Sequence, residues 1–150
     1  MKVKYTLIII SFLTCLTACK KQSTLPFENS KTLIVGKWFV KSFASRLYYN
    51  GTEVDSTFNS TFTSVDYAQY FSDGTGIFSS YNQPAPSLVT FNYTISGPNL
   101  TQRNAVNTPA VSETITLLTS KNLSFNYSLL IDDPNSGKIF TEKDTYDFSK

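Results

Sequence analysis

Few side chains in this 150-residue sequence could activate a nucleophile or hold a transition metal. Because the chain has no histidine, catalysis by imidazole, a Ser-His-Asp arrangement and histidine-ligated zinc or copper are all excluded. Serines are abundant, but no base accompanies them. Catalysis by a pair of carboxylates acting as acid and base remains an alternative, because a sequence does not show which acidic residues converge in space. We therefore expect a protein that is not an enzyme, with no catalytic residue, no metal site and no cofactor.

The densest run of oxygen ligands is the segment 132–137, Asp-Asp-Pro-Asn-Ser-Gly. Calcium loops alternate Asp and Asn ligands ahead of a glycine and end on a bidentate glutamate. Here only Asp133 and Asn135 alternate, Pro134 lies between them, and no glutamate follows at the required spacing. The segment is therefore more typical of a turn than of a calcium site.

The first 18 residues have the layout of a secretory signal peptide. Lys2 and Lys4 give a positively charged start, and an apolar run over 5–13 leads to a site of small residues. The apolar run is too short to cross a bilayer as a helix. We therefore expect residues 1–18 to be removed from the mature protein.

Residues 16–19, Leu-Thr-Ala-Cys, resemble the lipobox of bacterial lipoproteins, in which the cysteine carries lipid and the segment before it is cut off. The resemblance implies a lipoprotein signal peptide over 1–18, lipid attachment at Cys19, and a membrane contact made through that lipid. In such lipoproteins an aspartate after the cysteine can signal inner-membrane retention; Lys20 and Lys21 stand there instead. This implies an outer-membrane lipoprotein in the cell envelope of a gram-negative bacterium, facing the periplasm or the surface. The alternative is an ordinary signal peptide that leaves Cys19 as a free thiol.

The rest of the chain divides into a tether and one domain. Residues 19–31 are polar, contain Pro26 and lack apolar periodicity, so we expect a lipid-attached flexible tether. Residues 32–150 suffice for one domain with a sizeable core. Two of the 13 basic residues lie in the signal peptide, which leaves 11 against 11 acidic residues. This balance argues against a nucleic-acid partner, and we expect a monomer.

The domain reads as short strands separated by turns. Phe, Tyr, Val, Ile and Thr are plentiful, and Asn50-Gly51 is a strong hairpin signal. Closure into a barrel would remove the exposed edges of an all-β domain, so we favour a barrel over a sandwich. We predict an antiparallel meander of eight to ten strands. The expected strands are 36–43, 47–49, 52–55, 67–71, 75–81, 88–96, 100–103, 111–118, 123–131 and 139–148, with loops at 82–87 and 104–110 and a loop or weak strand at 58–64.

The single tryptophan stands in Gly36-Lys37-Trp38, which resembles the G-x-W signature that opens lipocalins. Residues 70–76, 93–100 and 115–125 follow in the order seen in the lipocalin-like domains of bacterial lipoproteins, with matching Asp-Gly-Thr-Gly, Ser-Gly-x-x-Leu and Ile-x-x-Leu-x-x-x-x-Leu patterns. The resemblance implies a lipocalin-like barrel over 32–150. Lipocalins proper pair the tryptophan with a late arginine, and the last arginine here is Arg103.

Aromatic side chains are the remaining candidates for a binding site, since the chain has 12 Phe and 9 Tyr. An eight-stranded barrel either fills with side chains or holds one small ligand, and large aromatics favour filling. We expect Trp38 to be buried at the closed end, against the last strand. The candidate ligand-binding residues are Trp38, Tyr70, Phe91, Tyr93, Phe125, Tyr127 and Tyr146; Phe78 and Phe148 could also line the interior.

Two functions follow from these alternatives. If the barrel holds a cavity, the protein binds a small apolar or amphipathic ligand. If the barrel is filled, the protein is a non-catalytic envelope interaction protein that binds a protein or glycan by its loops.

Overall fold

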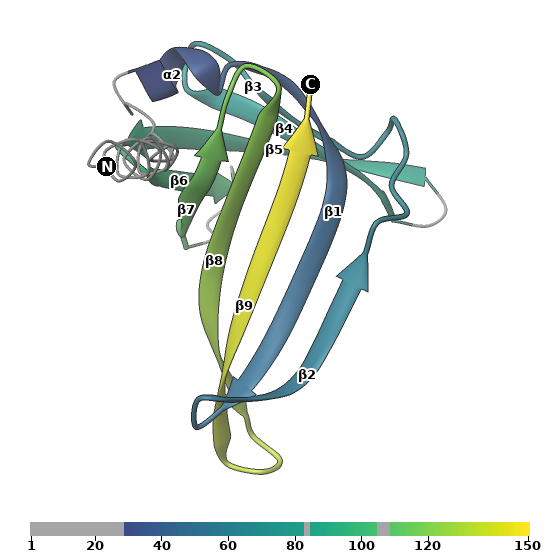
Figure 1. Cartoon of the computed structure of the whole chain (residues 1–150), viewed down its shortest axis with the longest axis vertical. Coiled ribbons are helices and arrows are strands. Elements are labelled where there is room, and N and C mark those ends of the chain that lie inside the picture. The colour runs from purple at the N-terminus through teal and green to yellow at the C-terminus, as the bar shows by residue number, and fades with distance from the viewer. Residues whose placement is uncertain (1–28, 83–84, 105–108) are drawn as a thin grey trace, which may run out of the picture.

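The computed structural model describes residues 29–82, 85–104 and 109–150, and it is built almost wholly of antiparallel strands (Figure 1). The expected signal peptide, Cys19 and most of the expected tether lie outside the described residues. Within the described ranges, no helix has the length and apolar character needed to cross a membrane. The elements are α2 (Ser30–Leu33), β1 (Gly36–Tyr49), β2 (Thr52–Asn59), β3 (Tyr67–Tyr70), β4 (Thr75–Asn82), β5 (Ala85–Ser96), β6 (Asn99–Asn104), β7 (Val111–Leu118), β8 (Asn122–Asp133) and β9 (Lys138–Ser149).

The sheet closes into a barrel of eight strands. The strands pair in the order β2-β1-β3-β4-β5-β6-β7-β8-β9, and β1 also pairs with β9. The ring therefore consists of β1 and β3 to β9, and β2 is an additional strand on the outside of the ring. The predicted all-β antiparallel barrel is confirmed.

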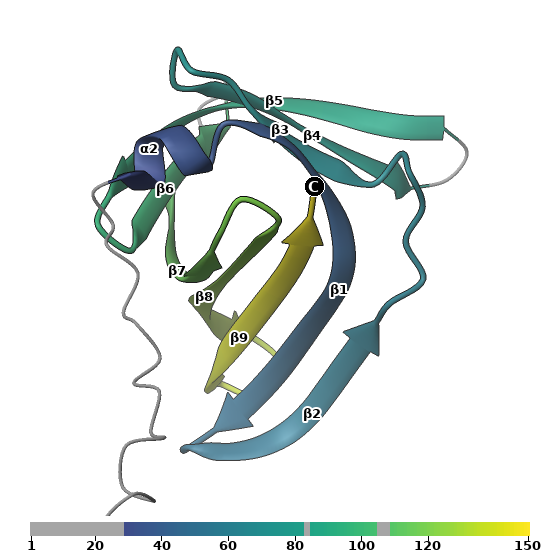
Figure 2. The ribbon, with the colours of Figure 1, turned by 45° about the horizontal axis from the view of Figure 1, so that its top comes forward.

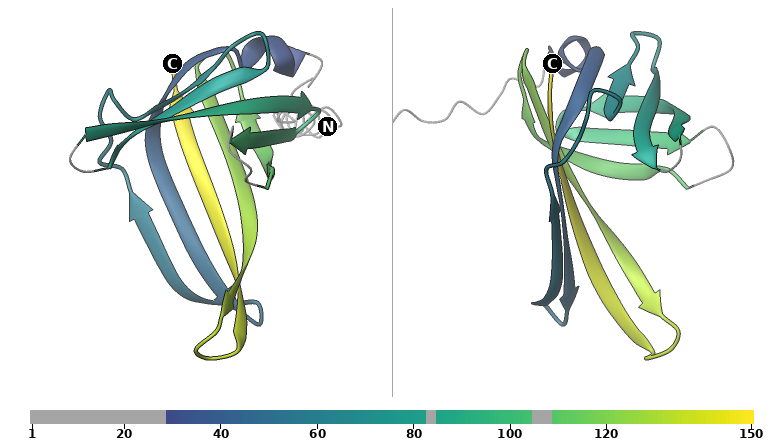
Figure 3. Two further views of the ribbon diagram at one scale, coloured as in Figure 1. Left: turned by 180° about the vertical axis from the view of Figure 1, so that it is seen from behind. Right: turned by 90° about the vertical axis from the view of Figure 1, so that its right-hand side faces the viewer.

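The strand β1 changes its hydrogen-bonding partner along its length. Residues 36–39 of β1 pair with β3, residues 43–49 pair with β2, and β9 follows its other edge. Beyond Asn126, β8 has no partner in β7. The barrel is therefore closed along one half only. The other half continues as a four-stranded sheet in the order β2-β1-β9-β8, which we call the open extension and which projects below the barrel (Figures 2 and 3).

The turn between β1 and β2 confirms the hairpin predicted from Asn50-Gly51. Asn50 has φ 50° and Gly51 has φ 81°, the left-handed backbone that this dipeptide tolerates. The two strands predicted before this turn, at 36–43 and 47–49, are one continuous strand. A register shift between Val40 and Ser42 bends β1 against β9 without ending it, as β-bulges do.

The loop predicted over 82–87 is wrong at residue 82, which ends β4, and at residues 85–87, which begin β5; residues 83–84 lie outside the described residues. Residues 85–90 pair with β4 but not with β6, so this part of β5 is an edge. Proline is tolerated on an edge, because its missing N–H costs no hydrogen bond to a second neighbour. Similarly, β2 continues to Asn59, into the segment predicted as a loop or weak strand. In the loop predicted over 104–110, β6 reaches Asn104, residues 109 and 110 are not in a strand, and 105–108 lie outside the described residues.

The closed end of the barrel holds a dense apolar core. Trp38 is fully buried there, and its indole Nε1 donates a hydrogen bond of 2.6 Å to the Ile34 carbonyl oxygen. The short helix α2, which begins with buried Ser30 inside the expected tether, lies over this end (Figure 1). The expected burial of Trp38 is confirmed. Its fully or nearly fully buried neighbours in the core are Ile34, Ala68, Tyr70, Leu100, Leu118 and Leu123.

A lysine lies over the single tryptophan. The Lys150 Nζ is 4.3 Å from the centroid of the Trp38 ring. The same ammonium donates hydrogen bonds to the carbonyl oxygens of Leu33 (3.2 Å) and Val35 (3.0 Å). The residue after β9 thus fastens the segment between α2 and β1, and it joins the two ends of the domain.

Candidate functional site

Toward the open extension, the interior of the barrel is not filled by side chains. A cavity of about 680 Å³ lies there, with walls from β3 to β9. Residues 127–129 of β8, which lead into the open extension, form part of its wall. The cavity is therefore at the end of the barrel opposite α2, and we call it the pocket. Its aromatic lining residues are Tyr70, Phe78, Phe91, Phe125, Tyr127, Tyr146 and Phe148.

Five of the seven candidate ligand-binding residues come together in the pocket, namely Tyr70, Phe91, Phe125, Tyr127 and Tyr146. Trp38 and Tyr93 are not among the residues that line it. Trp38 belongs to the core at the closed end. Tyr93 is 9% exposed, and its hydroxyl donates a 2.7 Å hydrogen bond to the Phe71 carbonyl oxygen, which fastens β5 to the turn after β3.

Ring contacts hold the aromatic wall in place. The Tyr70 ring contacts Phe91 at a centroid distance of 5.4 Å, and the Phe125 ring contacts Tyr146 at 5.6 Å and Phe148 at 5.3 Å. Gly76 on β4 makes room for this packing, because a Cβ there would overlap the Phe91 ring. The wall is thus a rigid apolar surface that presents ring faces and edges to a ligand.

A hydrogen-bonded group of three polar side chains, Gln102, Glu113 and Tyr70, forms part of the wall. The Gln102 Nε2 donates to Glu113 Oε2 at 2.6 Å and to the Tyr70 hydroxyl oxygen at 3.2 Å. Glu113 is 8% exposed, and burial raises the pKa of its carboxyl to about 7, although the hydrogen bond from Gln102 acts in the opposite direction. Burial, and then the charge of Glu113, raises the pKa of the Tyr70 phenol well above its ordinary value. The pocket therefore contains a carboxyl group that changes charge near neutral pH.

Glu113 and Gln102 are not among the residues predicted from the sequence, although the sequence contains a signal for Glu113. Residues 111, 113 and 115 of β7 read Val-Glu-Ile, so the glutamate occupies an apolar face at a spacing of two. A strand that places a carboxyl among inward-facing apolar residues marks a group that is either hydrogen-bonded or functional. Gln102 alternates with Leu100 in the same way on β6.

A second buried carboxyl lies next to the pocket. Asp144 on β9 is 4% exposed, pairs across the sheet with Tyr127, and has one oxygen, Oδ1, with no hydrogen-bond partner among the described residues. Burial, and then the hydrogen bond to Asp144, raises the pKa of the Tyr127 phenol. Burial, followed by the charges of Asp144 and Glu113, raises the pKa of Tyr146 to about 12. The negative charges of both carboxyls therefore raise the pKa of the same lining residue, Tyr146.

The acidic segment near the tip of the extension forms a turn, as predicted. The Asp133 Oδ1 accepts from the Asn135 backbone N–H at 3.0 Å, and Oδ2 accepts from the Ser136 hydroxyl at 2.6 Å. These hydrogen bonds lower the pKa of Asp133, and the bond from Ser136 has the largest effect. The described part of the chain brings together no group of three or more Cys, Asp or Glu side chains that could hold a metal ion.

A second hollow lies on the open extension, with a volume of about 410 Å³. It is more polar than the pocket, and its lining includes the two cations Arg46 and Lys143. The Lys143 Nζ is 4.8 Å from the centroid of the Tyr48 ring. The described structure thus offers two concave surfaces of opposite chemistry, one apolar and acidic, the other polar and basic.

The pocket, with its aromatic wall and single lining carboxyl, is the candidate site of the described chain. The chain matches no protein-family model, no curated protein and no solved structure.

Proposed function

We propose that this protein is a lipid-anchored lipoprotein of the bacterial cell envelope whose barrel binds a small apolar or amphipathic ligand. The observation that carries the proposal is the pocket of about 680 Å³ with seven aromatic residues in its wall. Ligand sites of proteins have volumes of about 300–1,000 Å³ and are lined mainly by apolar and aromatic groups with a few polar groups. The pocket has this size and this composition.

The contrast between the two halves of the barrel supports binding over packing. Large apolar side chains fill the closed end, where Trp38, Leu100 and Leu123 are fully buried. In the other half, the aromatic rings pack against one another along the wall and leave the centre open. A chain that needed only a stable core would gain more by filling that space, because voids cost packing energy.

The lipid anchor rests on the sequence pattern around Cys19. The described domain begins ten residues beyond this cysteine, at Asn29, so the intervening chain can serve as a tether. We propose that the anchor holds the domain at the outer membrane, where apolar molecules that need a carrier in water are abundant. In this proposal the protein is a monomer without a cofactor, does not bind nucleic acid and is not an enzyme.

Titration with N-phenyl-1-naphthylamine, a neutral apolar fluorophore, tests the pocket. We expect the full chain to bind this probe at one saturable site. Val111→Trp should weaken binding about tenfold or more, because Val111 lies in the pocket wall and an indole would occupy part of the cavity. Val54→Trp is the matched control, because Val54 is an exposed strand residue on β2 outside the pocket.

The control separates filling of the pocket from a general effect of an added indole. Equal affinities of the wild type and both variants would contradict binding in the pocket. Loss of binding in both variants would show that the probe does not report on this cavity.

The second candidate is an envelope interaction protein that binds a glycan or a protein. The specific observation in its favour is the polar hollow on the open extension, where Arg46 and Lys143 accompany Tyr48. Guanidinium and ammonium groups beside an aromatic ring suit an acidic sugar. If the probe fails to bind at all, this surface becomes the leading candidate.

A further inference from the structure

Resting on the proposed function, we propose that the pocket selects amphipathic ligands whose head is a protonated amine, and that it rejects carboxylate and phosphate heads. The proposal concerns the charge of the wall rather than its apolar area. Apolar area accepts any hydrophobic body, whereas an unneutralised charge distinguishes one head group from another.

The wall of the pocket is acidic and has no basic counterpart. Among the described residues that line it, Glu113 is the one charged side chain, and none is a lysine or an arginine. The Glu113 Oε2 accepts from Gln102, whereas no described residue donates to its other oxygen, Oε1. An ammonium group has three donors and no acceptor, so it could both donate to Oε1 and neutralise the buried charge.

Asp144 extends the negative potential behind the wall. It is buried between Tyr127 on β8 and Ser45 on β1, and its Oδ1 accepts no hydrogen bond from the described residues. The charges of Asp144 and Glu113 both raise the pKa of the Tyr146 phenol. A ligand head beside Tyr146 would therefore lie within the electrostatic reach of two acidic groups. An anionic head there would be a third acidic group, and the described lining residues include no lysine or arginine to offset it. Like charges in a poorly solvated site repel strongly.

The aromatic wall favours the same head group. Ammonium ions are attracted to the faces of Tyr and Phe rings, and the attraction increases when both partners are desolvated. Tyr146 and Phe125 provide such faces within the lining, next to the carboxyls. A body of stacked or alkyl carbons would then occupy the space between Phe78, Phe91 and Leu129.

A ligand series with one body and three heads tests the proposal. We would titrate the full chain at pH 8 with 6-phenylhexylamine, 6-phenylhexan-1-ol and 6-phenylhexanoate by calorimetry. At this pH the amine is protonated and Glu113 is mostly ionised. The amine should bind at least about tenfold more tightly than the alcohol, and the carboxylate should bind more weakly than the alcohol.

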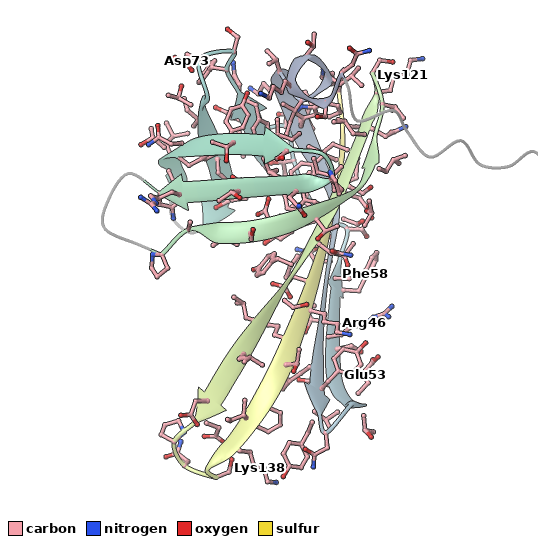
Figure 4. All side chains as sticks on the ribbon, turned by 90° about the vertical axis from the view of Figure 1, so that its left-hand side faces the viewer. Arg46, Glu53, Phe58, Asp73, Lys121 and Lys138 are labelled. Atoms are coloured by element: carbon pink, nitrogen blue, oxygen red, sulfur yellow. The ribbon has the colours of Figure 1, made fainter. Side chains whose placement is uncertain are left out.

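Two variants assign the preference to the wall. Glu113→Gln should remove most of the advantage of the amine and leave the affinity for the alcohol within about twofold. Glu53→Gln makes the same change of charge near the tip of the open extension, far from the barrel (Figure 4), and should leave the order of the three ligands unchanged.

The outcomes separate this inference from the proposed function. Three equal affinities, or tightest binding of the carboxylate, would overturn the amine preference and leave the apolar pocket as a binding site. An amine preference that persists in Glu113→Gln would also overturn it, because the charge of the wall would not be the cause. Absence of binding by all three ligands and by N-phenyl-1-naphthylamine would overturn the proposed function itself.

Discussion

Replacing Trp38 with alanine should lower the free energy of unfolding by about 3–5 kcal/mol, the usual cost of deleting a large buried aromatic side chain. Trp38 is fully buried among Ile34, Leu118 and Leu123, so the variant leaves a cavity where the barrel is most tightly packed. The change also removes the donor to the Ile34 carbonyl and the ring beneath Lys150. Urea unfolding followed by circular dichroism measures the loss.

Trp38→Phe serves as the matched variant. It keeps an aromatic ring but loses the indole N–H, so it should cost less than the alanine change. A loss of unfolding free energy below about 1 kcal/mol for Trp38→Ala would contradict a fully buried side chain, because losses that small are typical of substitutions at exposed positions. If Trp38→Ala does not fold, the free energies of unfolding of the wild type, Lys150→Ala and Trp38→Phe can still be compared. That comparison tests the contacts at the closed end of the barrel.

Raising the pH should destabilise the wild type relative to Glu113→Gln by about 3 kcal/mol. Burial raises the pKa of Glu113 from 4.5 to about 7 in the folded protein. The folded state therefore binds this proton more tightly than the unfolded state does. The resulting stabilisation is complete below pH 4.5, declines as the pH rises through 7, and is absent above that. Glutamine imitates the protonated carboxyl at every pH, so the variant lacks this change.

The measurement is the difference between the two unfolding free energies from pH 4 to pH 8.5. Taking the difference removes the contributions of other groups, among them Asp73 and Asp133, whose lowered pKa values act in the opposite direction. Glu53→Gln should follow the wild type throughout, because Glu53 is exposed on the extension. Parallel curves for the wild type and Glu113→Gln would contradict the burial of this carboxyl.

The positions of several strands and their inward faces follow from local sequence. Val89, Phe91, Tyr93 and Ile95 alternate along the strand predicted at 88–96 and share one face of β5, where the last three are buried. Val111–Leu118 is a strand with the predicted bounds. These features could be predicted because a strand has a period of two and because one side of the sheet faces the core.

The open half of the barrel could not be predicted from local patterns. It depends on β1 changing partners from β3 to β2 along its length, and on β8 continuing beyond its last pairing with β7. Partner changes of this kind are set by register between distant segments. The same limit explains why Trp38 and Tyr93 were grouped with the lining residues: their spacing is that of inward-facing residues, but spacing does not show at which end of a barrel a residue lies.

The role of Lys150 illustrates a limit of resemblance. Lipocalins proper pair the tryptophan with a late arginine, and this sequence has no arginine after Arg103. The structure shows a lysine ammonium over the Trp38 ring that also donates to two carbonyl oxygens. A flexible lysine at the end of the last strand can provide the same charge, which a motif search for arginine does not detect.

The most direct test of the central claim, that the pocket of this protein carries a small ligand, is native mass spectrometry of the protein isolated from bacterial envelopes. We predict a chain that begins at an acylated Cys19 and carries one non-covalent small molecule, which dissociates on activation and is absent from Val111→Trp. A wild-type spectrum without any such molecule, or one that Val111→Trp leaves unchanged, would contradict the account.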